Sequence, residues 1–254
     1  SQGISIQQIN LLRSADRIIT ARVALKAIAR RYGLHCTFMP RPSADLPGTG
    51  MHIHQTLHDI ESDDNRFLDT DNKYGLSELG EQFLAGQLTY ARAMTAILAP
   101  LVNSYKRLGT SFEAPMYVSW AHINRAALIR VPSTQPGQED HTRLELRLPD
   151  PASNPYLVQT VMLQAGLEGI RQKMELPPPL EETIVHQNRS RLRQLETLPN
   201  SLRQALDALE QSGLLLSALG PYISDRYIAT KRQEYDAYSR EVTQWELDHY
   251  FGLY

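Results

Sequence analysis

Charged side chains alternate with leucines in the segment TRLELRLP, where Arg143, Glu145 and Arg147 occupy every second position. Because a β-strand sends successive side chains to opposite faces, the two arginines and the carboxylate between them are predicted to share one face. Taken alone, the pattern favours a strand whose polar face meets water. Combined with other polar groups, the same face could bind a cation or a phosphorylated substrate.

Two histidines show the same period of two in the segment GTGMHIHQTL. His52 and His54 are predicted to lie on one face of a strand that directly follows a glycine-containing turn. Imidazole is a common ligand of divalent metals, and glycine lets the backbone approach a phosphate or a substrate closely. A single pair of this kind is more often two hydrogen-bonded histidines than a metal site.

Further charged residues follow in NSYKRLGTSFEAP, which contains Arg107 and Glu113, and in HINRAALIRVP, which contains Arg125 and Arg130. The planar fork of arginine suits carboxylate and phosphate oxygens. Several arginines beside metal ligands would neutralise the charge that develops in phosphoryl transfer. The alternative for any single arginine is an ion pair at the surface.

Helices and strands alternate irregularly in the elements that must position these residues. An amphipathic helix is predicted from Leu12 to Tyr32, with Gly33 at its C-terminal cap. A second helix is predicted from Ser77 to Leu98, ahead of Pro100, and a third begins near Pro155. The predicted strands span residues 35–42, 48–57, 116–120, 126–131 and 142–149, while 59–73 is a loop and the chain after 182 is helical. This order favours the α+β class over a doubly wound α/β sheet.

Composition excludes several classes of protein. The sequence has 254 residues, 42% of them hydrophobic and 21% charged, with a formal net charge of −2. This charge gives no reason to expect nucleic acid as a partner. Cys36 is the only cysteine, which rules out an internal disulfide and suits a reducing compartment. No apolar run approaches the roughly 20 residues of a membrane span, so we expect a cytoplasmic protein that does not bind membranes.

The motifs together resemble the glutamine synthetase family in order and spacing. The resemblance rests on HCTFMPRP followed by PGTGMHIHQTL, on NSYKRL with FEAP, on NRAALIRVP, and on RLELRLPDPASNPYL. It extends from about Ser14 to the C-terminal WELDHYFGLY. It implies a curved antiparallel sheet with helices packed on its outer face. Residues 1–254 would form one partial catalytic domain, with the site motifs within 1–175 and a mainly helical region over 176–254.

The resemblance also implies an activity. Members of this family use ATP to phosphorylate the γ-carboxylate of glutamate, and ammonia or an amine then displaces phosphate to form an amide. Two divalent cations, Mg²⁺ or Mn²⁺, hold the site, and the enzymes are homo-oligomers. This chain would be an ATP-dependent ligase of that type or its C-terminal catalytic part. Two alternatives stay open, a ligase for polyamines and a non-catalytic relative that binds other subunits.

Roles for individual residues follow from the same resemblance. His52 and Glu145 would bind a metal ion, and Gly48 would line the glutamate pocket through its backbone. Arg107 and Arg147 would bind the carboxylates of glutamate. Arg125 and Arg130 would stabilise the phosphate and the transition state, and Arg130 would also bind substrate and ATP. His54, Thr56 and Arg143 would bind ATP. Glu113 would close over the acyl phosphate.

The family pattern also includes carboxylates that this sequence lacks. They belong ahead of the first helix, where SQGI places Gly3 at a position usually held by glutamate. Glu145 would then be the one metal-binding carboxylate of this chain. We therefore expect the isolated chain to have little or no synthetase activity.

Overall fold

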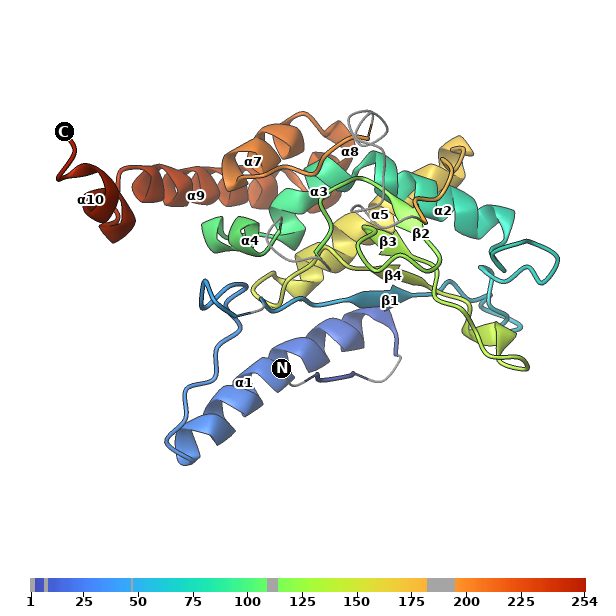
Figure 1. Ribbon diagram of the computed structural model, residues 1–254. Coiled ribbons are helices and arrows are strands. Elements are labelled where there is room, and N and C mark those ends of the chain that lie inside the picture. The colour runs from blue at the N-terminus through green and yellow to red at the C-terminus, as the bar shows by residue number, and fades with distance from the viewer. Residues whose placement is uncertain (1–2, 7–8, 47, 109–113, 182–194) are drawn as a thin grey trace.

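The computed structural model describes residues 3–6, 9–46, 48–108, 114–181 and 195–254 (Figure 1). Helices predominate, and the strands are short. In chain order the elements are α1 (Leu11–Arg31), β1 (Ile53–Gln55), α2 (Glu78–Thr89), α3 (Ala91–Leu98), α4 (Val102–Arg107), β2 (Trp120–Ala121), β3 (Ile129–Arg130), the 3₁₀ helix η1 (Glu139–His141), β4 (Leu144–Leu146), α5 (Pro155–Gln172), α7 (Leu202–Glu210), α8 (Gly213–Leu219), α9 (Pro221–Ser239) and α10 (Gln244–Tyr250).

The helices begin where the sequence places capping residues. The side chains of Asn10, Ser77 and Asn154 accept hydrogen bonds from the first turns of α1, α2 and α5, and Pro155 occupies the first turn of α5. Gly33 follows α1 with a φ of 68°, a left-handed conformation that glycine adopts without strain. The helix predicted over 77–98 is present as two consecutive helices, α2 and α3, which meet at Tyr90.

The four strands form one sheet in the order β1-β4-β3-β2. β4 is antiparallel to β1 and to β3, whereas β2 runs parallel to β3. The α+β class is therefore confirmed, with a mixed sheet where the family resemblance implied an antiparallel one. A strand predicted over 35–42 was wrong, because this segment makes no ladder with another strand among the described residues.

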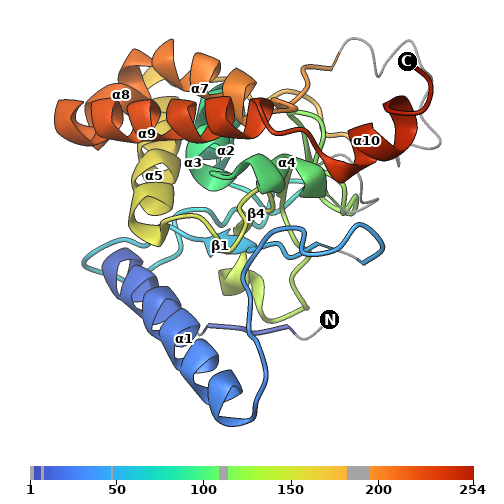
Figure 2. The ribbon, with the colours of Figure 1, turned by 90° about the vertical axis from the view of Figure 1, so that its left-hand side faces the viewer.

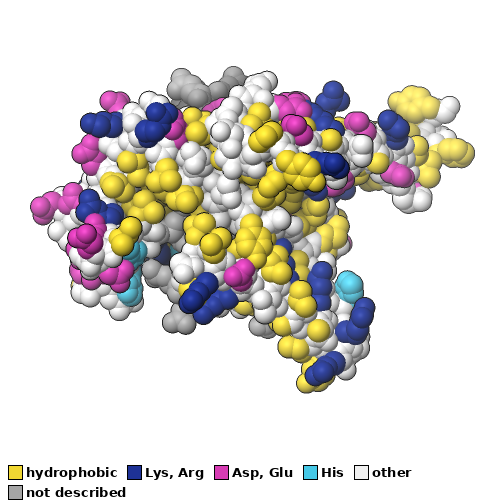
Figure 3. All heavy atoms as spheres, turned by 180° about the vertical axis from the view of Figure 1, so that it is seen from behind, with side chains coloured by type: hydrophobic (Ala, Val, Ile, Leu, Met, Phe, Trp, Pro, Cys, Tyr) yellow, Lys and Arg dark blue, Asp and Glu magenta, His cyan; other side chains and the backbone are white. Residues whose placement is uncertain are grey.

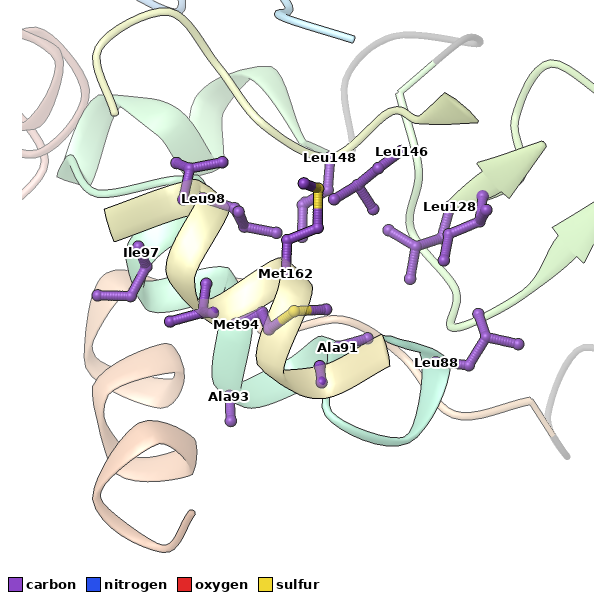
Figure 4. Packing of buried hydrophobic residues seen from close by; sticks show 14 of the residues in the cluster. Leu88, Ala91, Ala93, Met94, Ile97, Leu98, Leu128, Leu146, Leu148 and Met162 are labelled. Carbon is purple, nitrogen blue, oxygen red and sulfur yellow. The ribbon is translucent and has the colours of Figure 1, made fainter. Parts of the chain in front are cut away.

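The core lies between the sheet and the helices that follow it in the chain. Leu144, Leu146 and Leu148 are fully buried on one face of β4, which is the alternation that the sequence predicted. In Figure 4, Met162 of α5 and Met94 of α3 lie beside one another, with Leu146 and Leu148 at the sheet end of the cluster. The sheet is thus fixed against α3 and α5, which makes its other face the place where polar side chains can gather.

Helix α1 lies apart from this core, on the opposite side of the sheet from α7 and α9 (Figures 1 and 2). Two polar contacts attach it near the start of α5. Arg22 Nη1 donates to the Ser153 carbonyl at 3.0 Å, and the Tyr156 hydroxyl donates to Asp16 at 2.5 Å. Within the described part of α1, Ala15 alone is buried. Most of the apolar side chains of this helix are therefore not covered by the rest of the described chain.

Both ends of the described chain expose apolar side chains, as the two projecting parts in Figure 3 show. In α1 and the segment after it these are Leu12, Val23, Ile28, Tyr32 and Leu34, and in the C-terminal region they are Trp245, Phe251, Leu253 and Tyr254. None of the described helices combines the length and the apolar character needed to cross a membrane.

Candidate active site

Glu145 of β4 is the centre of a cluster of charged side chains. The register of the sheet places it between His54 of β1 and Arg130 of β3. Its Oε2 accepts from Arg130 Nε at 2.7 Å, and its Oε1 accepts from Arg147 Nη1 at 2.7 Å. His52 Nδ1 lies 3.0 Å from the same Oε1. One carboxylate thus contacts two guanidinium groups and an imidazole that come from three strands or their flanks.

This cluster is shielded from water. The side chains of Glu145 and Arg147 are only 4% and 6% exposed, while Arg130 and His52 reach 23% and 39%. A strand whose polar face meets water, the simplest interpretation of the alternating sequence, is therefore wrong. A buried carboxylate at this position needs counter-charges, and the two arginines supply them.

The surroundings of Glu145 keep it ionised. Burial alone would raise the pKa of this carboxyl, but the hydrogen bond with His52 and the charges of Arg147 and Arg130 lower it to about 2. Glu145 is consequently a carboxylate across the physiological pH range. It can serve as an acceptor or a metal ligand, and it cannot donate a proton.

His54 lies on the same face of β1 and contacts a different arginine. Arg143 Nε donates to His54 Nδ1 at 3.1 Å, and Arg143 Nη1 donates to the His141 carbonyl at 3.0 Å. Because Nδ1 accepts this bond, the proton of the neutral ring is on Nε2. Burial lowers the pKa of His54 below its ordinary value, although the charge of Glu145 opposes this effect. His54 is therefore a neutral hydrogen-bond donor at the exposed edge of the cluster.

Arg107 approaches the cluster from the end of α4. Its side chain is buried, and Nη2 donates to the Leu148 carbonyl just beyond β4. Two glycines leave space for it. A Cβ on Gly48 would lie 2.8 Å from Arg107 Cγ, and a Cβ on Gly50 would lie 3.3 Å from Arg107 Nη1 and 3.6 Å from His52 Nε2. The glycine turn, Arg107 and His52 are therefore neighbours.

Three further residues were predicted to belong to the site, namely Arg125, Thr56 and Glu113. Arg125 is exposed on the connection between β2 and β3. Thr56 is half-buried directly after β1. Glu113 lies outside the described residues.

The donor atoms available for a divalent cation are those of His52 and Glu145. Their adjacent Nδ1 and Oε1 atoms form a mixed imidazole and carboxylate pair, which suits Mn²⁺ and, with additional oxygen ligands, Mg²⁺. Across the described residues, no group of three histidine, cysteine, aspartate or glutamate side chains comes together in a way that could hold a metal ion. The pair therefore fits part of a metal site.

Sequence reasoning missed Asp150, a fully buried acid in the segment LPDP directly after β4. Its signal was present, because an acidic residue between two prolines at the end of a strand that bears site residues has few ways to reach water. The charges of Arg107 and Arg22 both act on this carboxyl.

Known proteins resemble this chain over nearly its whole length. A family model described as the catalytic domain of glutamine synthetase matches residues 2–250. The chain belongs to the glutamine synthetase family. The glutamine synthetase of Clostridium saccharobutylicum is 42% identical over 245 residues, which are 96% of this chain and 54% of that protein. The enzyme of Thermus thermophilus is 40% identical over 99% of this chain and 56% of its own length.

Solved structures agree with these relatives of the glutamine synthetase family. A complex of GmaS with ADP has a TM-score of 0.87 and 34% identity, covering 96% of this chain and 55% of that protein. GmaS without ligand has a TM-score of 0.83, also at 34% identity, over 95% of this chain and 54% of its own. The chain thus spans about half the length of the family members it matches.

Proposed function

We propose that the protein forms an amide at the γ-carboxylate of glutamate by way of γ-glutamyl phosphate. The observation that carries this proposal is the buried Glu145 carboxylate, shared by His52, Arg130 and Arg147. In the reaction, an oxygen of the γ-carboxylate attacks the γ-phosphorus of ATP and ADP leaves. Ammonia or an amine then attacks the acyl carbon, and inorganic phosphate leaves with the bonding electron pair.

Each member of the cluster has a part in this chemistry. His52 and Glu145 would hold Mg²⁺ or Mn²⁺, which when bound supplies Lewis-acid stabilisation of the phosphate charge. Arg130, whose side chain is 23% exposed, can turn part of its guanidinium toward the transferred phosphoryl group. Arg107 and Arg147 would bind the carboxylates of glutamate, with Gly48 lining the pocket. Arg125 and Glu113 keep their predicted roles at the phosphate and over the acyl intermediate.

The nucleotide would lie along the edge strand β1, where His54 meets Arg143 just before β4. His54 offers a neutral N–H at Nε2, and Arg143 beside it offers positive charge for phosphate oxygens. Thr56 continues the same strand edge, and Arg130 contributes from β3. The ADP complex of the similar GmaS protein supports a nucleotide site in this fold.

The test of the proposal is an assay on the protein encoded by the whole gene. Magnesium, ATP, glutamate and ammonium are expected to release phosphate together, and polyamines or other amines would be tried in place of ammonium. Release with polyamines alone would assign the polyamine branch. If no amine acceptor gives phosphate release, the ligase activity is refuted and the non-catalytic relative is favoured. We further predict that the isolated chain has little or no activity. We also predict that the full-length protein is a cytoplasmic homo-oligomer.

Replacing Arg143 by methionine is expected to weaken ADP binding about tenfold, because one charge-assisted contact to phosphate is lost. Isothermal titration calorimetry with Mg²⁺ and ADP measures this affinity directly. Arg232→Met is the matched control, since Arg232 of α9 pairs with Asp207 and Glu210 of α7 at 2.5 and 2.7 Å. Equal affinities for the two variants would contradict the nucleotide role of Arg143.

Replacing Gly48 by alanine is expected to raise the KM for glutamate about tenfold with a smaller effect on the KM for ATP. The added Cβ would lie 2.6 Å from the Pro40 carbonyl and 2.8 Å from Arg107 Cγ, so Arg107 must move. Gly213→Ala is the control, because a Cβ there meets nothing within 4 Å. An unchanged KM in a folded Gly48→Ala variant would argue against a glutamate pocket at this turn.

A further inference from the structure

Residues 176–181 (LPPPLE) form a proline segment that lies against the edge strand β2. The Leu180 amide of this segment donates to the Trp120 carbonyl at 2.8 Å. The Pro177 carbonyl accepts from the indole Nε1 of the same tryptophan at 2.6 Å. Consecutive prolines hold the backbone extended, because each ring fixes its own φ. The proline segment is therefore a stiff neighbour of β2, on the side that β3 does not occupy.

Glu181 ends the proline segment and binds the backbone of the β2–β3 connection, residues 122–128. Its Oε1 accepts from the His122 amide at 2.7 Å, and its Oε2 accepts from the Ile123 amide at 3.0 Å. Bonds from N–H groups to an ionised carboxylate are among the stronger hydrogen bonds of proteins. One side chain, 58 or more positions away in sequence, thus holds the first two residues after β2.

The next part of the connection is fixed around Arg125. Asn124 Nδ2 donates to the Leu180 carbonyl at 3.0 Å, and Asn124 Oδ1 accepts from the Ala126 amide at 2.9 Å. Asn124 is 5% exposed, whereas Arg125 beside it is exposed. The residues on both sides of Arg125 are thus held in place, while Arg125 itself reaches the surface.

The β2–β3 connection leaves the sheet beside the Glu145 cluster. In the register of β2 with β3, Ala121 is the partner of Arg130. Arg130 Nε in turn donates to Glu145 at 2.7 Å. His122, the first residue that Glu181 binds, follows Ala121 directly. A shift of the connection therefore changes the position of Arg125 relative to the cluster.

We propose that Glu181 is a positioning residue, which fixes the β2–β3 connection so that Arg125 can stabilise the transferred phosphate. The role of Arg125 in this inference rests on the proposed function, whereas the binding of two amides by Glu181 does not. Glu181 contacts no substrate in this role, so its loss acts through Arg125. Because Arg125 is expected to act on the transition state, the effect should fall on kcat and not on KM.

The kinetic experiment uses Glu181→Gln in the product of the whole gene. We expect kcat to fall about tenfold, with the KM values for glutamate and ATP within about twofold. Glutamine has a single acceptor oxygen, so it can bind only one of the two amides. Glu181→Asp, which keeps both acceptor oxygens on a shorter side chain, should recover part of kcat. An unchanged kcat in Glu181→Gln overturns the proposal.

Glu175→Gln is the matched control for this experiment. Glu175 is an exposed acid directly ahead of the proline segment, so the same chemical change is made in the same stretch of chain. Its kcat should equal that of the wild type. A loss as large as that of Glu181→Gln would show that the charge of this stretch matters and the bound amides do not, which overturns the proposal.

A double-mutant cycle separates positioning from a general disturbance of the site. If Glu181 acts through Arg125, adding Glu181→Gln to Arg125→Met lowers kcat no further than Arg125→Met alone. If Glu181→Gln acts by another route, the two losses multiply. Multiplied losses therefore overturn the proposal.

Amide hydrogen exchange tests the contact without any assay of activity. Mass spectrometry of a peptide spanning residues 120–125 is expected to show at least one amide exchanging about tenfold faster in Glu181→Gln. Glu175→Gln should exchange as the wild type does. An unchanged rate in Glu181→Gln overturns the positioning role, whatever the kinetics show. If the wild type releases no phosphate, the proposed function fails, and the exchange rates still decide whether Glu181 fixes the connection.

Discussion

Replacing Glu145 by glutamine is expected to lower the free energy of unfolding of the metal-free protein by about 3–5 kcal/mol. Glutamine keeps the shape of the side chain and removes its charge. Arg147, at 6% exposure, would then be a buried cation without its carboxylate partner, and Arg130 would lose the partner it contacts at 2.7 Å. The cost comes chiefly from the arginines that remain.

Urea unfolding in EDTA measures this change. Glu168→Gln is the control, because Glu168 is also a buried acid paired with an arginine, but Arg171 is 68% exposed and water can replace its partner. Its loss should stay below about 1 kcal/mol. Adding Arg147→Gln to Glu145→Gln should cost less than the sum of the two single changes, because the pair is lost only once. Similar losses for Glu145→Gln and Glu168→Gln would contradict the prediction.

The pH dependence of this difference has a definite sign. The pKa of Glu145 is lowered from an ordinary value of 4.5 to about 2, so the folded state favours the ionised form. Its contribution is fully present above about pH 4.5 and is lost as the pH falls toward 2. The wild type and Glu145→Gln should therefore approach each other in stability over this interval, in EDTA. A difference that stays constant from pH 5 to pH 2 would show that the carboxylate charge is not responsible.

The side chains that share a face could be predicted from the sequence, but their partners could not. A period of two correctly placed Arg143, Glu145 and Arg147 together and His52 with His54. Whether that face meets water depends on strand register and on what covers the sheet. The antiparallel pairing of β1 with β4 brings His52 to Glu145 across 93 positions of sequence, and local patterns carry no information about such a pairing.

The fold shows the same division between local and distant information. Capping residues and prolines predicted the starts of α2 and α5 correctly, because those signals act within one turn of helix. The segment 35–42 has the composition of a strand, yet it has no ladder partner in the described chain. The parallel pairing of β2 with β3 was missed for the same reason, since strand direction is set by the connections around it.

Helices α2 and α5 approach each other closely at a pair of glycines. Gly169 of α5 lies against Gly86 of α2, and a Cβ on Gly169 would lie 2.7 Å from Gly86 Cα and closer still to the Gln82 carbonyl. A Cβ on Gly86 would likewise meet the backbone of α5. Backbone atoms cannot rotate away as a side chain can, so the whole helix has to shift to accept either substitution.

Gly169→Ala is expected to destabilise the protein by about 3 kcal/mol through this overpacking. Alanine in a helix interior normally stabilises by up to about 1 kcal/mol relative to glycine, so the sign of the change tests the packing directly. Thermal or urea unfolding measures it. Gly213→Ala is the control, since a Cβ there meets nothing within 4 Å. A neutral or stabilising Gly169→Ala would mean that α2 and α5 are farther apart than the structure has them.

The Gly169→Ala variant also tests whether the packing of α2 against α5 affects the proposed nucleotide site. Gly169 is near the C-terminal end of α5, whereas Asp150 and Ser153 precede its first turn, about 20 Å away along the helix axis. The polar contacts of Arg22 and Asp150 at that first turn do not involve the contact between the glycines. Below its unfolding temperature, Gly169→Ala should therefore keep the nucleotide affinity of the wild type. A loss of ADP binding in the folded variant would show that α5 transmits its position to the sheet as a rigid body.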